Sequence, residues 1–265
     1  MDGTAINDLL AGEHHVVVLD EIDSTNEEIK RRARAGTEHG LIVIAERQTA
    51  GKGRNGRSFF SPKGTGIYLS VLLDVHEEMF ADVMLLTTQA AVAVAHAVSE
   101  VCHRETWIKW VNDVYYEDKK ICGILAEALT EPETGQICQV IAGIGINVYR
   151  PREIPEELTD VVGYVMGEDE RVPGLRERLA AAVINELTMY YEAMPDRSFI
   201  SEYRERSRIL GQTIRYGAPQ PDGQPGEDWK TGIARAIDDS GGLVIECSDG
   251  NTEVLRTGEI SVRIK

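Results

Sequence analysis

The sequence predicts an α+β protein built from two domains. The first part of the chain mixes helix-like and strand-like patterns, whereas the part after Gly211 contains short strand candidates separated by glycine and aspartate turns. Such closely spaced strands are typical of a small antiparallel barrel. The length of 265 residues is enough for one or two domains. We therefore place a boundary near Leu210, with a larger domain at 1–210 and a small domain at 211–265.

The elements follow from local patterns. A capping-box pattern at Ser24, followed by two glutamates, predicts a helix that ends near Gly36. The apolar run 41–45 predicts a buried strand, and similar patterns predict strands at 67–73, 107–110, 114–116, 121–129 and 139–148, with a hairpin turn at 118–120. Helices are predicted at 84–102, 174–194 and 197–209. The last strand candidates are 213–216, 232–237, 243–247, 253–255 and 259–264.

Composition excludes several classes of function. The chain has 44 acidic and 28 basic residues, a net charge of −16, so a general nucleic-acid-binding role is disfavoured by repulsion. No apolar run approaches the ~20 residues that cross a bilayer, and the N-terminus lacks a signal-peptide pattern, so we expect a cytoplasmic protein. The four cysteines form no C-x-x-C pair, which predicts reduced thiols. Neither H-E-x-x-H nor G-x-S-x-G occurs, and no metal ligands are assigned.

A cationic heptad at 51–57 stands out against this acidic background. It holds three glycines and the cations Lys52, Arg54 and Arg57, and no acid occurs within 48–73. Glycine lets the backbone approach a ligand closely, and lysine and arginine side chains match phosphate oxygens. The heptad therefore indicates a phosphate-binding loop, and the alternative is a flexible, solvated surface loop.

Two known phosphate-binding fingerprints are excluded. Gly51-x-Gly53-x-x-Gly56 matches the dinucleotide fingerprint, which must open a helix, but Pro62 and the glycines after it block a helix. A Walker A loop is excluded because Glu46 stands where a glycine is required, and Gly53 where serine or threonine is required.

Two further clusters interrupt strand-like sequence. Lys109-Trp-Val-Asn-Asp113, with two lysines shortly after it, indicates either a surface ion pair or a lysine aimed at phosphate or carboxylate oxygens beside an aspartate that accepts a proton or orients a group. Gly143-Ile-Gly-Ile-Asn147 indicates either a bulge or a strand that another group must approach closely. The residues alone leave both alternatives open.

Taken in order, these motifs closely resemble those of biotin protein ligase (biotin–[acetyl-CoA-carboxylase] ligase). The resemblance spans 16–148 and rests on Asp-Ser-Thr-Asn at 23–26, Gln48, the heptad, 109–113, Lys120 with Cys-Gly-Ile-Leu at 122–125, and 143–147. It implies a mixed sheet flanked by helices and a small C-terminal SH3-like barrel. It also implies that biotin and ATP give biotinyl-5′-AMP and pyrophosphate with Mg²⁺. Biotin would then pass to a lysine of the biotin carboxyl carrier domain of acetyl-CoA carboxylase or another biotin-dependent carboxylase.

The resemblance implies roles for individual residues. Lys120 would hold the biotin carboxylate and the α-phosphate, Arg54 would belong to the adenylate-binding loop, and Asp113 would be the acid near the reactive centre. Contacts with the biotin ureido ring are implied for Ser24, Thr25, Gln48 and the backbone near Gly123. The other residues assigned to binding are Asn26, Gly51, Lys52, Gly53, Arg57, Lys109, Asn112 and Asn147.

The sequence departs from the family pattern at a few positions. The family usually has arginine where Lys52 stands, often tryptophan where Phe59 stands, and proline where Val111 stands; lysine keeps the charge without the forked donor. About 15 residues precede the first strand, too few for the helix-turn-helix domain of some relatives, so no nucleic-acid or membrane partner is expected. The alternatives are a lipoate–protein ligase and a non-catalytic regulator that binds biotinyl-AMP. A homodimer is left open.

Overall fold

The structure is a computed structural model of the 265-residue chain. It describes residues 1–12, 14–36, 39–76, 85–167, 169–194, 196–218, 228–256 and 261–264. The predicted starts of a helix at Met84 and of a strand at Glu259 lie outside the described residues.

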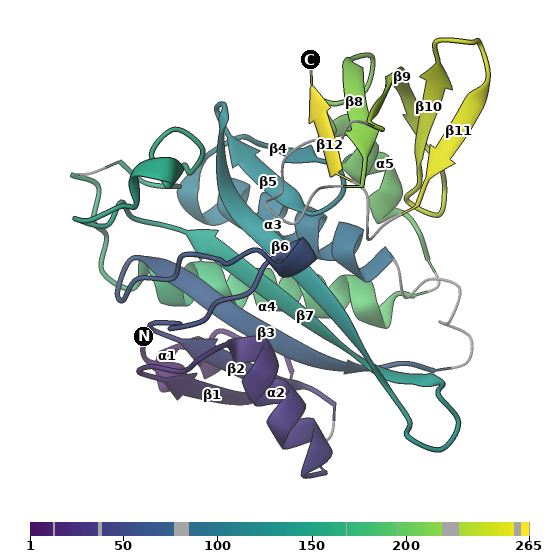
Figure 1. Ribbon diagram of the computed structural model, residues 1–265. Helices are drawn as coiled ribbons and strands as arrows, with labels where there is room; N and C mark the ends of the chain where they lie inside the picture. Colours follow the sequence, from purple (N-terminus) through teal and green to yellow (C-terminus); the bar gives the residue numbers. More distant parts are fainter. Residues whose placement is uncertain are drawn as a thin grey trace.

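A seven-stranded mixed sheet forms the centre of the molecule (Figure 1). β1 and β2 are parallel, and the other neighbouring pairs of this sheet are antiparallel. Its strands, in spatial order, are β1 (His15–Leu19), β2 (Leu41–Ala45), β3 (Gly66–Asp74), β7 (Ile137–Asn147), β6 (Lys119–Thr130), β5 (Asp113–Tyr116) and β4 (Thr106–Lys109). The mixed sheet that the family resemblance implied is therefore confirmed.

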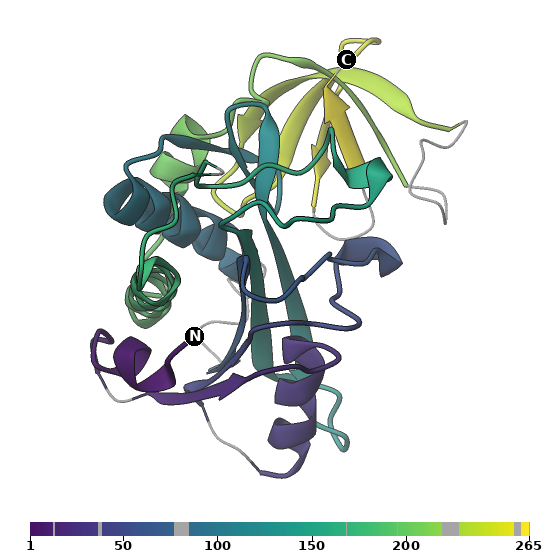
Figure 2. The same ribbon diagram turned by 90° about the vertical axis from the view of Figure 1, so that its left-hand side faces the viewer.

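Helices cover both faces of this sheet (Figure 2). α3 (Leu86–Cys102) and α4 (Leu175–Glu192) pack against each other on one face, with α1 (Gly3–Asn7) and α5 (Phe199–Glu205) beside them. α2 (Thr25–Arg34) packs on β2, β3 and β7 from the other face. Successive residues of β2 point to opposite faces of the sheet, so both faces need cover. Ile42 and Ile44 join the core beneath α3 and α4, whereas Leu41 and Val43 pack on Ile29 of α2.

Most predicted elements are present, and a few boundaries were wrong. The run 41–45 is a fully buried strand, as predicted. The hairpin turn lies at Glu117 and Asp118, whereas both following lysines belong to β6, because Glu117 takes the positive φ of 52° that reverses the chain. α5 ends at Glu205 rather than at 209, since Ser207 forms a β-bridge with Ile108. The short helix α1 had not been predicted.

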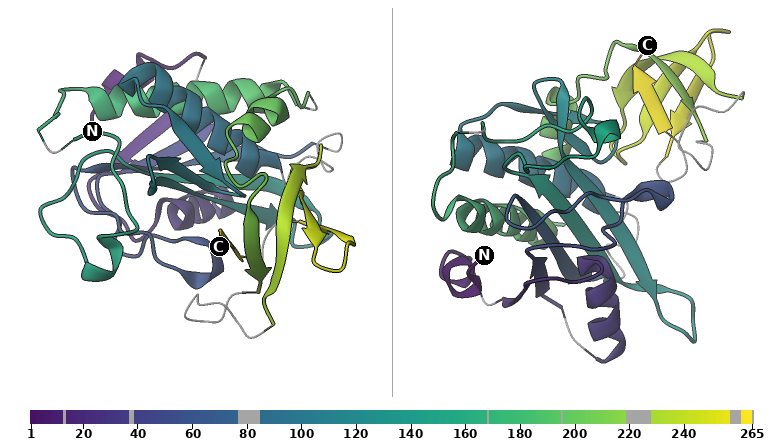
Figure 3. Two further views of the ribbon diagram at one scale, coloured as in Figure 1. Left: turned by 90° about the horizontal axis from the view of Figure 1, so that it is seen from above. Right: turned by 60° about the vertical axis from the view of Figure 1, so that its left-hand side comes forward.

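A second, smaller antiparallel sheet lies at the C-terminal end of the chain, as predicted (Figure 3). Its strands, in spatial order, are β11 (Thr252–Leu255), β10 (Leu243–Cys247), β9 (Lys230–Ile237), β8 (Thr213–Gly217) and β12 (Ser261–Ile264). Trp110 Nε1 donates a hydrogen bond of 2.9 Å to Gly241 O, and Arg204 Nε donates one of 2.7 Å to Ile237 O. These bonds hold the small sheet beside the end of the large one. The division of the chain at residue 210 stays a prediction.

The structure also bears on the other sequence-based expectations. All four cysteines are free thiols. Among the described helices, none combines the length and the apolar character that a membrane span requires.

Candidate active site

A cleft lies over β3, β6 and β7, between the start of α2, the cationic heptad and the small sheet. Its empty volume, including the part open to solvent, is about 1020 Å³, ample for a small-molecule ligand. Val262 of β12 also lines the cleft, so the small sheet contributes to its wall. The predicted residues that line it are Ser24, Thr25, Asn26, Gln48, Lys52, Gly53, Arg54, Arg57, Lys109, Asn112, Asp113, Lys120 and Gly123.

Two of the predicted binding residues are not among those that line the cleft. Gly51 lies beneath the heptad, where a Cβ would stand 2.5 Å from Phe59 O and 2.8 Å from Ser61 Oγ. Asn147 ends β7, and its carbonyl accepts a hydrogen bond from Val165 N. Gly51 therefore acts in the structure as a close-packing position that lets the loop fold back on itself.

One end of the cleft is a polar cluster around the Gln48 side chain. Gln48 Oε1 accepts hydrogen bonds from Thr25 N at 2.9 Å and Thr25 Oγ1 at 3.2 Å, and Gln48 Nε2 donates to Ser61 Oγ at 2.9 Å. The start of α2 and the loop after β2 are thereby fixed to each other. The result is a rigid set of donors and acceptors, the kind of arrangement that orients a bound polar ring.

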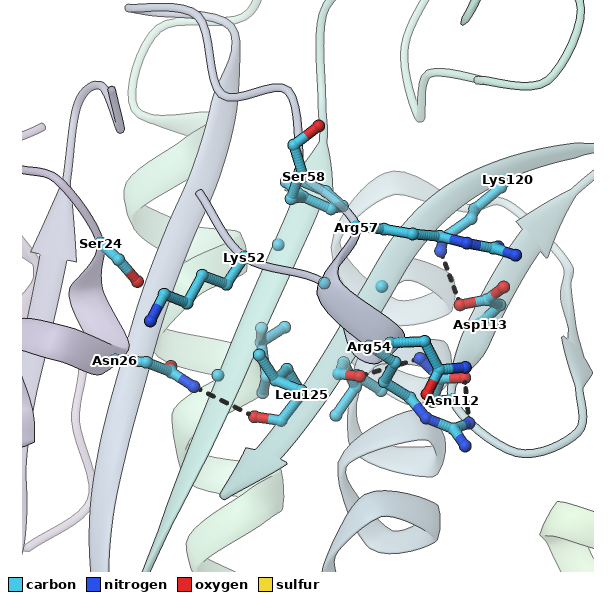
Figure 4. Close-up of a pocket in the computed structure, with 18 of the residues that line it drawn as sticks. Ser24, Asn26, Lys52, Arg54, Arg57, Ser58, Asn112, Asp113, Lys120 and Leu125 are labelled. Carbon is cyan, nitrogen blue, oxygen red and sulfur yellow. Dashed lines mark hydrogen bonds and ion pairs between the residues drawn. The ribbon is translucent and has the colours of Figure 1, made fainter. Parts of the chain in front are cut away.

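Ser24 corrects one expectation from the sequence. It occupies the N-cap position of α2 with extended φ and ψ of −155° and 137°, but its side chain makes no capping hydrogen bond. The residue is 2% exposed and lines the cleft. The Ser24 hydroxyl therefore faces the cleft instead of satisfying the helix end, as Figure 4 shows.

The floor of the cleft is formed where Asn26 packs on β7. Asn26 Oδ1 lies 2.5 Å from Ser70 Oγ, and Asn26 Nδ2 donates to Glu127 Oε2 at 2.7 Å. A Cβ at Gly143 would stand 2.2 Å from Asn26 Oδ1. β7 pairs with β3 and β6 in continuous register at this point, so the bulge alternative is wrong and the close-approach alternative is confirmed.

The Phe59 ring packs on Gly145, the second glycine of the 143–147 motif. A Cβ at Gly145 would stand 2.5 Å from the Phe59 ring, and a Cβ at Gly123 would stand 3.3 Å from it. The ring therefore lies on a patch of bare backbone at the floor of the cleft. Sequence reasoning named the glycines but did not assign Phe59, Gly143 or Gly145 to the site, although all three line it.

The cationic heptad folds as a small hairpin over the cleft. Lys52 and Ser58 form an antiparallel bridge, and Gly53 N donates to Arg57 O at 2.7 Å. A short 3₁₀ turn at Arg54–Gly56 caps the hairpin, visible as the dark blue turn in front of β6 in Figure 1. No helix follows the heptad, which agrees with the exclusion of a dinucleotide fingerprint.

The side chains of the heptad point into the cleft with defined partners (Figure 4). Arg54 Nη1 donates to Asn112 Oδ1 at 3.0 Å, and Asn112 Nδ2 donates to Ile124 O at 2.9 Å. Burial lowers the pKa of Arg54, and the nearby Asp113 carboxylate opposes that effect. An arginine stays charged under these conditions, so a positive group is held in a partly dehydrated place.

Lys120 and Asp113 form an ion pair inside the cleft. Lys120 Nζ lies 2.6 Å from Asp113 Oδ1, and the two side chains are 26% and 22% exposed (Figure 4). The sequence offered a surface ion pair between an aspartate and a lysine as one of two alternatives. The ion pair is present, but its two side chains line the cleft rather than the outer surface. Cys122 beside it is fully buried, and burial raises the pKa of its thiol. Cys122 is therefore not poised to act as a thiolate nucleophile beside these charged groups.

Two family models match separate parts of this chain. A family model for the biotin/lipoate A/B protein ligase family matches residues 18–147, and one for the biotin protein ligase C terminal domain matches residues 224–263. The bifunctional ligase/repressor BirA of Escherichia coli strain K12 is 31% identical over 94% of this chain and 74% of its own length. The chain belongs to the biotin/lipoate A/B protein ligase family. The biotin--[acetyl-CoA-carboxylase] ligase of Mycobacterium tuberculosis is 31% identical over 98% of this chain and 95% of its own length.

Solved structures of family members have the same fold. A biotin protein ligase from Aquifex aeolicus in complex with biotin and ATP superposes with a TM-score of 0.73 at 28% identity, covering 95% of this chain and 99% of that one. A biotin protein ligase from Leishmania major in complex with biotinyl-5-AMP gives 0.61 at 25% identity, covering 93% and 100%. The similarity in fold therefore extends over both sheets of this chain.

Proposed function

We propose that this protein is a biotin–[biotin carboxyl carrier protein] ligase that makes biotinyl-5′-AMP from biotin and ATP, and then transfers biotin to a carrier lysine. One observation carries the assignment. In a chain of net charge −16, the cations of the heptad, Lys109 and Lys120 share one cleft with the polar cluster around Gln48. Asp113 is the single acid among the described residues that line it.

The polar cluster suits the ureido ring of biotin. That ring presents two N–H donors and one carbonyl acceptor on a compact, uncharged head. The Ser24 hydroxyl, Thr25 and the amide of Gln48 offer the complementary donors and acceptors, and Phe59 and Leu125 offer apolar contact beside them. We place the ureido head at this end of the cleft and the carboxylate toward Lys120.

The first step joins two anions. A biotin carboxylate oxygen attacks the α-phosphorus of ATP, the bond from that phosphorus to the bridging oxygen breaks, and pyrophosphate leaves. Repulsion between carboxylate and phosphate opposes this approach, so fixed positive charges supply the main stabilisation. Lys120 and Arg54 are two of the cations that line the cleft, and we assign this stabilisation to them; no protein nucleophile is required.

The second step needs a neutral amine. The carrier lysine attacks the acyl carbon, the acyl–phosphate bond breaks, AMP leaves and one proton must be removed. In the structure the Asp113 carboxylate is engaged by Lys120 at 2.6 Å. When Lys120 turns to the phosphate of the adenylate, Asp113 is released and serves as the proton acceptor.

Mg²⁺ is part of the proposed reaction as a companion of ATP. Among the described residues, no cluster of three or more acids, histidines or cysteines is arranged to hold a metal ion. Mg²⁺ commonly binds through substrate phosphates, waters and one or two carboxylates. The ion would bind mainly through the phosphates of ATP and through water, and it would add positive charge at the phosphates.

Replacement of Lys120 tests the assignment. Lys120→Ala should abolish biotin-dependent exchange of pyrophosphate into ATP, since the charge that faces both anions is lost. Mass spectrometry of the wild-type protein after incubation with biotin, ATP and Mg²⁺ should show biotinyl-AMP. Lys230→Ala is the matched control, because Lys230 lies on β9 and pairs with Glu253 away from the cleft. Near wild-type exchange by Lys120→Ala would refute the role of this lysine. Formation of lipoyl-AMP when lipoate is supplied, without formation of biotinyl-AMP from biotin, would favour a lipoate ligase.

Transfer is tested with a carrier. Labelled biotin should appear on the target lysine of a biotin carboxyl carrier domain of a biotin-dependent carboxylase, and not on a variant of that domain with the lysine replaced. Binding of added biotinyl-AMP, with neither its formation from biotin and ATP nor transfer to any such carrier, would favour the non-catalytic regulator.

A further inference from the structure

A chain of alternating charges connects the cationic heptad to the floor of the cleft. Lys52 Nζ lies 2.5 Å from Glu27 Oε1, which also accepts from Lys30 Nζ at 2.9 Å. Lys30 Nζ donates to Glu127 Oε1 at 2.7 Å, and Glu127 Oε2 accepts from Asn26 Nδ2 at 2.7 Å. We call these five residues the ion-pair chain. Its members come from the heptad, α2 and β6, which are far apart in sequence.

The inner end of the ion-pair chain is immobilised by the sheet. Asn26 is 4% exposed and packs against the bare backbone of Gly143, and its Oδ1 lies 2.5 Å from the fully buried Ser70 hydroxyl. Asn26 therefore has one orientation, with its amide nitrogen toward Glu127. The bond from Asn26 fixes Glu127, and Glu127 in turn fixes the ammonium group of Lys30.

The outer end reaches the loop that covers the cleft. The Lys52 side chain is 45% exposed, whereas Lys30 is 17% exposed, so the chain runs from solvent into the protein. Hydrogen bonds from Lys52 and then Lys30 lower the pKa of Glu27, as expected for a carboxylate between two ammonium groups. Glu27 is the member of the ion-pair chain that bonds to Lys52 of the heptad.

We propose that Glu27 is a positioning residue that holds the cationic heptad over the cleft, so that the bound acyl-adenylate is retained. Lys52 links α2 to the loop through both its side chain and its backbone. Its ammonium pairs with Glu27, and its backbone forms the first rung of the loop hairpin with Ser58. Loss of the pair frees the loop to open, and ligand then leaves faster.

The first experiment needs no ligand and compares hydrogen–deuterium exchange of Glu27→Gln with that of Glu28→Gln. Both glutamates lie in the first turn of α2, but Glu28 pairs with Arg31 and Arg32, away from the heptad. Glu27→Gln should speed exchange at the amides of Gly53 and Phe59, whose hydrogen bonds close the hairpin. Equal exchange in the two variants would overturn the proposal.

The second experiment measures the dissociation rate of biotinyl-AMP, and this arm rests on the proposed function. Glu27→Gln should speed release by about two- to fivefold, the range expected for a partly exposed ion pair. In a Lys52→Met background the same change should have no further effect, because the partner is already gone. Glu28→Gln, which leaves the Glu27–Lys52 pair intact, should release ligand at the wild-type rate.

The outcomes separate the two proposals. If the effects of Glu27→Gln and Lys52→Met multiply, Glu27 does not act through Lys52 and the inference fails. If the wild-type protein forms no biotinyl-AMP, the proposed function fails, and the exchange experiment alone decides the role of Glu27. Equal thermal midpoints of Glu27→Gln and Glu28→Gln show that neither result comes from general unfolding.

Discussion

Replacement of Gly143 by alanine should damage the floor of the cleft and the stability of the protein together. The added Cβ would stand 2.2 Å from Asn26 Oδ1 and 2.9 Å from both Asn26 Cγ and Nδ2. Backbone of β7 is held by β3 and β6 on both sides, so the Asn26 side chain must move. Movement by about 1 Å breaks its contacts with Ser70 and Glu127.

The size of the effect follows from those two contacts. A hydrogen bond to the charged Glu127 contributes about 1.5–3 kcal/mol, and the neutral bond to Ser70 contributes about 1 kcal/mol. The free energy of unfolding should therefore fall by about 3 kcal/mol, which lowers the thermal midpoint by about 5–10 °C. The KM for biotin in pyrophosphate exchange should rise as well, because Asn26 lines the cleft.

A double-mutant cycle decides whether Asn26 is the cause. Urea denaturation of wild-type protein, Gly143→Ala, Asn26→Ala and the double variant gives the four free energies of unfolding. In the Asn26→Ala background the clashing side chain is absent, so the added methyl should cost less than about 1 kcal/mol. An equal loss in both backgrounds would refute the close-approach explanation.

Other predictions concern single contacts. Arg54→Ala should speed dissociation of biotinyl-AMP, measured by chase with unlabelled ligand, since a half-buried cation of the heptad is lost; an unchanged rate would exclude it from ligand retention. Asp113→Asn should slow transfer to the carrier while ATP binding stays normal in calorimetry, and a defect in ATP binding alone would show that Asp113 is not the proton acceptor. The forked contact with Arg31 lowers the pKa of Asp23 from 3.8 to about 2. The stability from this exposed pair is present above pH 3.8 and disappears as the pH falls through about 2, and an NMR titration midpoint near 3.8 would contradict it.

The sequence by itself determined the local structure and the order of the binding motifs. The run 41–45 became a strand with those same bounds, because five consecutive apolar residues require burial on both faces of a sheet. The heptad was recognisable because three cations among glycines are unusual in a chain of net charge −16. The family resemblance, which rests on the order of such motifs along the chain, named thirteen of the residues that line the cleft before the fold was known.

Only the tertiary structure decided what each side chain faces. The capping pattern at Ser24 predicted a helix start, yet its hydroxyl lines the cleft, since Gln48 and not the helix end is the neighbour that organises this turn. Gly143 and Gly145 could have marked a bulge, and the packing of Asn26 and Phe59 on them settled the matter. Lys52 pairs with Glu27 of α2, and Val262 of β12 lines the same cleft although it lies more than 100 residues further along the chain. Contacts between residues so distant in sequence depend on how sheets and helices stack, which no local pattern encodes.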